Sequence, residues 1–103
     1  MDADVIAEPS RVLKVLADPL RWRIVELLAV EDLCVCHLVE ALGAAQPLVS
    51  HHLRALRQAG VVSTEPCGAF TYYLLDRSVL ASLGDALGAL GRVPQSPRRR
   101  PCT

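Results

Sequence analysis

Two cysteines separated by one residue, Cys34 and Cys36, offer the clearest chemistry in this chain of 103 residues. Thiolates are soft ligands, so a Cys-x-Cys pair favours arsenic, antimony, cadmium, lead or copper(I) over magnesium or calcium. Both cysteines lie where a helix is expected to begin, and the helix dipole at that end lowers the pKa of a thiol. The pair therefore predicts a site for a soft ion, with thiolates available at neutral pH.

The spacing of the pair also predicts how binding acts on the helix. Side chains two residues apart on a helix diverge by about 200°, whereas in an extended segment they point to one side. One ion would therefore hold both sulfurs best after the first helical turn unwinds. Since this helix is expected to pack on the next one, unwinding would tilt residues 46–57 away from a bound partner.

A third ligand for the ion can come from several places. Cys67 lies in a predicted hairpin, Cys102 lies in a long tail, and His37 beside the pair would complete a zinc or cadmium site. A small cellular thiol can also serve, and a monomethylated arsenical needs only two protein ligands. Two other uses of the pair stay open, namely oxidation by peroxide and burial as small apolar side chains.

The periodicity of apolar residues predicts the elements that position the pair. Asp18 can cap a helix that opens with Pro19, and Gly43 can end the helix that carries the cysteines. Two β-rich runs around residues 66–69 predict a hairpin with a four-residue loop. We expect helices from Val5 to Leu16, from Pro19 to about Ala29, from about Val35 to Leu42 and from Pro47 to Gly60, a connection at 31–33, strands at 61–65 and 70–75, and a last helix after Asp76.

This order of elements predicts a mainly α fold with a small β-hairpin, a winged helix-turn-helix. Residues 1–91 are expected to form the domain, and residues 92–103, with three prolines and Arg98–Arg100, a disordered tail. In such a fold the second helix of the pair enters the major groove of DNA. The expected DNA contacts are Gln46, Leu48, Ser50, His51, Arg54 and Arg57.

Two alternatives accompany this interpretation of the helix. Its polar face can be an ordinary solvated surface, and the domain can serve as a protein-interaction module that binds no DNA. His52 differs from the other polar residues, because its place beside Leu53 predicts a structural histidine that faces the interior and is hydrogen-bonded.

Charge and hydropathy narrow the classes of protein further. The formal net charge is zero, but residues 1–45 are acidic and residues 46–103 are basic, so a nucleic-acid partner is compatible with the neutral total. No apolar run approaches the roughly 20 residues that span a bilayer, and the acidic N-terminus is unlike a signal peptide. We expect a cytoplasmic protein with reduced cysteines and no membrane partner. No catalytic motif is present, so neither an enzyme nor a catalytic cofactor is expected.

Over about residues 10–90 the chain resembles the ArsR/SmtB family of metal-sensing repressors, and its arsenic-responsive branch in particular. The resemblance rests on residues 16–21, 32–38 and 46–56, and on Gly60-Val61-Val62 and Tyr72-Tyr73 around the wing. It implies a homodimer, held by the first and last helices, that binds operator DNA and is released by As(III) or Sb(III) at Cys34 and Cys36. It also implies that Gln46, Ser50 and His51 contact DNA. A repressor of the same fold that responds to thiol oxidation or to cadmium, lead or zinc is the alternative.

The chain departs from the family pattern in three places. Val39 stands where the arsenic-responsive branch often has a third cysteine, so a third ligand must come from elsewhere. The wing carries residues 65–68 (Glu-Pro-Cys-Gly) where basic residues are common, which predicts weak phosphate contacts. The zinc site on the family's last helix uses carboxylates and histidines. Here Ser78 replaces a histidine, and Ala89, eleven residues further on, offers no ligand atom, so no zinc site is expected there.

Overall fold

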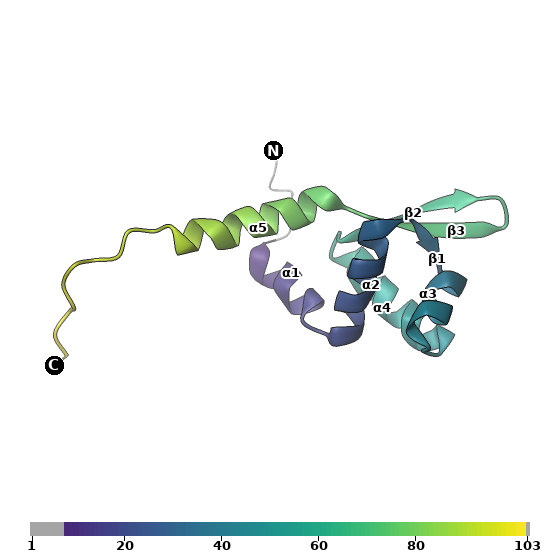
Figure 1. Ribbon diagram of the computed structural model, residues 1–103, viewed down its shortest axis with the longest axis horizontal. Helices are drawn as coiled ribbons and strands as arrows, with labels where there is room; N and C mark the ends of the chain where they lie inside the picture. The colour runs from purple at the N-terminus through teal and green to yellow at the C-terminus, as the bar shows by residue number, and fades with distance from the viewer. Residues whose placement is uncertain (1–7, 103) are drawn as a thin grey trace.

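The computed structural model describes residues 8–102, which form five helices and a three-stranded sheet (Figure 1). The fold confirms the predicted mainly helical winged helix-turn-helix. Val5, which was expected in the first helix, lies outside the described residues. In chain order the elements are α1 (Pro9–Leu16), α2 (Pro19–Val30), β1 (Leu33–Cys34), α3 (Val35–Leu42), α4 (Gln46–Gln58), β2 (Val62–Cys67), β3 (Phe70–Leu75) and α5 (Arg77–Gly91).

Local chemistry sets the ends of the helices. The Asp18 carboxylate accepts hydrogen bonds from the backbone N–H groups of Leu20 at 2.8 Å and Arg21 at 3.2 Å, and Pro19 is the first residue of α2. Gly43 ends α3 with a φ of 63°, a left-handed conformation that glycine adopts without a steric penalty. These ends were predicted. α4 begins at Gln46 and ends at Gln58, not at Pro47 and Gly60 as expected.

The core lies between α2, α4 and the sheet, with α1 and α5 closing one side. α4 contributes Val49, Leu53 and Leu56, each no more than 1% exposed. Burying one such side chain stabilises the fold by about 1.5–3 kcal/mol. The other fully buried side chains of the core are Val12, Ile24, Leu28, Leu38 and Val61.

The sheet has the strand order β1-β3-β2 and is antiparallel throughout. Leu33 was expected in a connection and Cys34 at the start of a helix. Instead Leu33 pairs with Tyr73 and Cys34 with Tyr72, which ties the residue before α3 to the wing.

The β2–β3 hairpin is tighter than predicted. Cys67 pairs with Phe70, so the expected four-residue loop is a two-residue turn at Gly68 and Ala69. The φ of Gly68 is +61°, as the first residue of a type II′ turn requires. Pro66 fits within β2 because this is an edge strand, where a missing backbone N–H need not break a ladder.

The arrangement in space separates two ends of the molecule. In Figure 1, α3, α4 and the hairpin lie at one end, while α5 runs away from the hairpin and continues into the tail. Residues 92–102 form no helix or strand. Leu87 and Leu90 on α5 are 48% and 72% exposed, so the second half of this helix presents an uncovered apolar edge. No helix within residues 8–102 is both long and apolar enough to cross a membrane.

Candidate ligand site and DNA-reading helix

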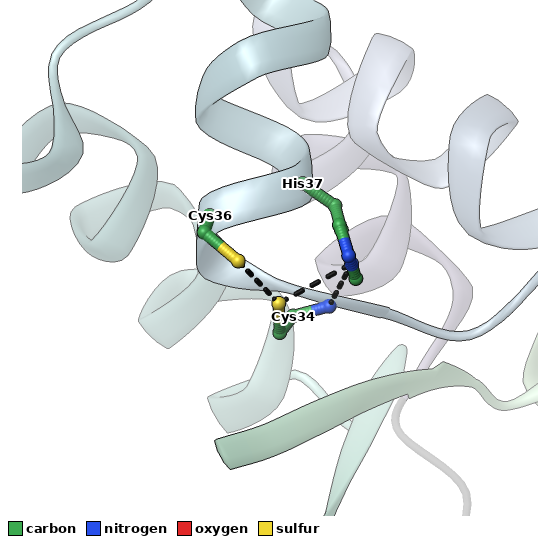
Figure 2. A group of neighbouring side chains, drawn as sticks. All are labelled: Cys34, Cys36 and His37. Carbon is green, nitrogen blue, oxygen red and sulfur yellow. Dashed lines mark hydrogen bonds between the residues drawn. The ribbon is translucent and has the colours of Figure 1, made fainter. Parts of the chain in front are cut away.

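Cys34 and Cys36 meet at the junction between β1 and α3. Cys34 is the N-cap of α3 and has an extended backbone, with φ −92° and ψ 171°, while Cys36 is the second helical residue. Their sulfurs are 2.6 Å apart (Figure 2). Cys34 is 5% exposed and Cys36 is open to solvent. One thiol is thus buried at the foot of the helix, and the other lies beside it at the surface.

The premise from which unwinding of α3 was expected is therefore wrong. It assumed that both cysteines have helical backbone, but the extended conformation of Cys34 already turns the two sulfurs toward each other (Figure 2). An ion with metal–sulfur bonds of about 2.3 Å sits between sulfurs that are further apart than this pair. Rotation of the exposed Cys36 side chain provides that separation without unwinding a helical turn.

His37 joins the pair through a single ring nitrogen. Its Nδ1 accepts a hydrogen bond from the backbone N–H of Cys34 at 3.2 Å and lies 3.2 Å from the Cys34 sulfur. The two sulfurs and a ring nitrogen lie within 4.8 Å of one another, close enough for one ion. Cys67 on β2 and Cys102 in the tail, the other expected ligands, do not belong to this cluster in the described part of the chain.

The two thiols differ in acidity because they share a hydrogen bond. The pKa of Cys34 is lowered, chiefly by the hydrogen bond with the Cys36 side chain and further by nearby backbone N–H groups. The pKa of Cys36 is raised, chiefly by its hydrogen bond with Cys34. The expectation that the helix start lowers both pKa values is therefore wrong for Cys36. Cys34 is the first thiolate to form, and the Cys36 S–H donates to it.

Two grooves flank the pair and connect it to α4 and the wing. One of about 410 Å³ is lined by both cysteines, by Arg57 near the end of α4 and by Phe70 and Tyr73 of β3. The other, of about 400 Å³, has Cys36 beside Gln46 at the start of α4, together with Val39. A group bound at the sulfurs therefore lies beside both ends of α4 and beside the wing.

α4 presents the predicted polar residues on one side and buries the other. Gln46, Leu48, His51, Arg54 and Arg57 are exposed, and Ser50 is half-buried. The opposite side carries the core residues Val49, Leu53 and Leu56. The helix therefore offers a continuous polar face that ends in two arginines, with Leu48 as an apolar contact near its start.

His52 is the structural histidine that the sequence predicted. It is 7% exposed, and its Nδ1 accepts a hydrogen bond from Nε of Arg21 at 2.9 Å. Its Nε2 lies 4.0 Å from the Asp18 carboxylate. Burial lowers the pKa of His52, so the neutral ring is favoured and accepts the Arg21 hydrogen bond. No local sequence pattern indicates this partner of Arg21, which lies 31 residues away along the chain.

Comparisons with known proteins agree with this geometry. Residues 18–64, from the cap of α2 into β2, match the sequence profile of the bacterial regulatory protein arsR family. An arsenic resistance transcriptional regulator of Pseudomonas putida is 38% identical over 111 residues, which cover 89% of this chain and 87% of that protein. An arsenical resistance operon repressor of Staphylococcus xylosus is 35% identical over 88 residues, 85% of each chain.

The chain belongs to the arsR family of bacterial regulatory proteins. It is therefore a DNA-binding transcriptional regulator and not an enzyme. Among solved structures, a homodimeric winged helix-turn-helix DNA-binding domain from Mycobacterium bovis superimposes with a TM-score of 0.67. It is 26% identical, and the match covers 88% of this chain and 86% of that one.

Proposed function

We propose that this protein is a repressor of an arsenical-resistance operon, released from its operator when As(III) or Sb(III) binds Cys34 and Cys36. The observation that carries the proposal is the contact between the two sulfurs at 2.6 Å at the start of α3. Soft thiolate pairs prefer such ions. Two relatives whose names refer to arsenic or arsenical resistance support the choice of ion.

The DNA contacts are proposed to come from the exposed face of α4. Gln46 can pair with adenine, and Leu48 can meet a thymine methyl group. Ser50 and His51 can bond to bases or to phosphates. Arg54 and Arg57 neutralise phosphates, and no acidic residue lies between Gln46 and Glu65 to oppose them.

Dimerisation is proposed to occur through α1 and α5. The apolar edge of α5 at Leu87 and Leu90 is uncovered, and Leu13 on the neighbouring α1 is 40% exposed. Pairing two copies would bury these side chains, which a small domain needs for stability. The homodimeric state of the Mycobacterium bovis domain supports this arrangement.

Release is proposed to follow from the grooves beside the sulfurs. An ion bridging Cys34 and Cys36 pushes the exposed Cys36 outward, toward the side chains that line the grooves. Gln46 and Arg57, at the two ends of the DNA-reading helix, lie on those grooves. Occupancy of the site therefore favours a different tilt of α4. By linkage, DNA must weaken arsenite binding by the same factor by which arsenite weakens DNA binding.

The test compares matched cysteine variants on an operator duplex recovered by selection from a random DNA pool. Cys34→Ser and Cys36→Ser should bind this duplex but stay bound when arsenite or antimonite is added. Cys67→Ser and Cys102→Ser, at the two cysteines outside the cluster, should be released like the wild type. If either variant of the pair fails to bind DNA without any ligand, the pair is structural and the proposal is wrong.

A thiol-protection measurement identifies the ligands directly. The protein is treated with an alkylating reagent with and without arsenite, and the modified cysteines are located by mass spectrometry. Cys34 and Cys36 should be protected by arsenite. Protection of Cys67 or Cys102 as well would identify the third ligand, and protection of neither member of the pair would contradict the proposed site.

A second candidate ligand is a divalent soft ion, because His37 adds a nitrogen to the two sulfurs. Such a set suits zinc or cadmium. The same operator assay with cadmium, lead and zinc separates this function from the first. His37→Ala should abolish release by cadmium or zinc and leave release by arsenite intact if the divalent ion uses the ring nitrogen. Release by peroxide without a reductant, and no release by arsenite under reducing conditions, would favour a disulfide switch instead.

A further inference from the structure

We propose that residues 92–102 are a second DNA-binding segment, which neutralises phosphates and places arginines along a groove of the duplex next to the site bound by α4. The proposal rests on DNA binding by this chain but not on the identity of its inducer. It starts from the charge of the elements that face DNA in a winged helix-turn-helix.

Those elements are electrically neutral in this protein. Helices α3 and α4 and the hairpin carry Arg54 and Arg57, and they also carry the acidic Glu40 and Glu65. No lysine or arginine lies on β2 or β3. Duplex DNA presents one negative charge per about 1.7 Å of its axis, and affinity depends strongly on how many phosphates are neutralised. The domain therefore supplies few of the cations that its partner requires.

Several other arginines are engaged within the fold. Arg21 binds His52, and Arg77 donates to the Ala29 carbonyl oxygen at 2.8 Å. Arg23 pairs with Glu26 at 3.5 Å. The guanidinium of Arg92 lies over Gly88, where it would be 2.9 Å from an added Cβ atom. Arg21, Arg23 and Arg77 are thus held by intramolecular contacts on helices other than α4. Arg92, the first residue of the tail, lies against the end of α5, so the proposal relies on Arg98–Arg100 alone.

The tail has the opposite character. Arg98–Arg100 are consecutive and exposed, and no acidic residue occurs after Asp85. Within the described residues, none of the three is in an ion pair with a carboxylate. Ser96 accepts a hydrogen bond from the Arg98 backbone N–H at 3.4 Å, and its hydroxyl donates to the Arg98 carbonyl at 3.1 Å. Three uncompensated cations are thus concentrated in a short exposed segment.

Proline spacing gives the segment reach. Pro97 and Pro101 flank the arginines, and Pro94 lies just after α5. Prolines favour an extended backbone of about 3.1 Å per residue, so residues 93–102 can span about 31 Å, close to one turn of DNA. Extended arginine-bearing arms of DNA-binding proteins enter the minor groove, most readily where it is narrow. In Figure 1 the tail leaves the end of α5 that is remote from the hairpin and from α3, so its arginines would contact the duplex beyond the stretch bound by α4.

The experiment measures the salt dependence of binding to a duplex of mixed sequence, without arsenite. The variant Arg98→Gln/Arg99→Gln/Arg100→Gln removes three charges outside the core, so its unfolding midpoint should match that of the wild type. Each phosphate contact contributes about 0.9 to the slope of log K against log salt. The variant should therefore lower the magnitude of the slope by about 2.7 per bound tail, and its affinity should approach that of the wild type at high salt.

A charge-conserving control separates contact with phosphates alone from insertion of the arginines into the minor groove. Arg98→Lys/Arg99→Lys/Arg100→Lys keeps the slope in either case, and a loss of affinity confined to A·T-rich duplexes would place the arginines in the minor groove. An unchanged slope in the glutamine variant overturns the proposal. Vesicles of anionic lipid test the competing partner. If the wild type binds the vesicles and the glutamine variant does not, while both proteins show the same salt dependence on DNA, the tail is assigned to membranes instead. Neither result bears on release by arsenite, so the failure of this proposal is distinct from failure of the proposed sensing function.

Discussion

Helices α3 and α4 lie side by side, and they are fixed to the domain by different means. α4 buries Val49, Leu53 and Leu56 and is further held by the hydrogen bond between Arg21 and His52. α3 has a single fully buried side chain, Leu38, and its first turn is held through the short strand β1. The helix proposed to read DNA is thus fixed in the core, whereas the helix that carries the sulfurs is anchored at fewer points. The proposed release therefore begins at the helix that is anchored at fewer points.

The largest expected difference between α4 and α3 is in the stability that each loses when one of its apolar side chains is shortened. Leu53→Ala should lower the free energy of unfolding by about 2–5 kcal/mol, because it leaves a cavity in the core. Val39→Ala, at a half-buried position on α3, should cost about 1 kcal/mol, typical of point substitutions. Urea denaturation measures both values. Equal losses would show that the two helices are anchored alike.

Leu48→Ala is the control on the same helix as Leu53. Leu48 is 46% exposed, so its removal should change stability by no more than about 0.5 kcal/mol. Because Leu48 is a proposed DNA contact, this variant should nevertheless bind the operator more weakly. A variant that loses stability but binds normally would contradict the placement of Leu48 on the DNA-facing side.

A loss of stability smaller than that of Leu53→Ala is expected when the hydrogen bond between Arg21 and His52 is removed. His52→Ala leaves Arg21 without its acceptor and should cost about 1–3 kcal/mol of unfolding free energy. His52→Asn is the matched variant, because its amide oxygen can accept the same hydrogen bond near the position of Nδ1, so it should lose less. If both variants lose equal stability, the hydrogen bond contributes little and only the volume of the ring matters.

His52 also predicts a dependence of stability on pH. Burial lowers its pKa in the folded protein below the unfolded value of about 6.5, although Asp18 nearby acts in the opposite direction. The stabilisation by neutral His52 is therefore complete above about pH 6.5 and is lost as the pH falls from there through the folded pKa. Unfolding curves across this range should show that loss in the wild type and less of it in His52→Asn.

A last difference concerns how ligand binding at α3 varies with pH. Where Cys34 is a thiolate and Cys36 keeps its proton, binding a divalent ion releases that proton, so cadmium affinity should rise by up to about tenfold per pH unit. Arsenite binds as As(OH)₃, and the thiolate, the thiol and one proton from solution yield a dithiol complex and two waters. Its affinity should fall as the pH rises through the same range. Calorimetric titration with cadmium and with arsenite at several pH values measures both affinities. If the two affinities change in the same direction with pH, the assigned protonation of the cysteine pair is wrong.

Local rules predicted most of the elements, because their signals are contained within a few residues. The cap at Asp18, the stop at Gly43 and the apolar spacing of α4 each act over one or two helical turns. The hairpin was found, but its turn was placed too widely because Pro66 was taken as a loop residue. Proline is excluded only from paired interior strands, and the sequence does not show that β2 lies at an edge.

Other features that the sequence did not reveal depend on distant partners. β1 has only two residues and gains its structure from Tyr72 and Tyr73, almost forty residues on. The sulfur pair was identified, but its geometry was not, because it depends on the extended backbone that β1 imposes on Cys34. For the same reason the spacing argument assigned a helical relation to two residues that do not share a helix.

The pairing of β1 has a consequence for how such a scaffold can diversify. A ladder between Leu33–Cys34 and Tyr72–Tyr73 is made by backbone groups, which every residue type other than proline can provide. The exposed position 36 is therefore free to vary without loss of the strand, while the buried position 34 accepts only small side chains. One architecture can thus change the chemistry of the side chain at position 36 while the backbone pairing between β1 and β3 is kept.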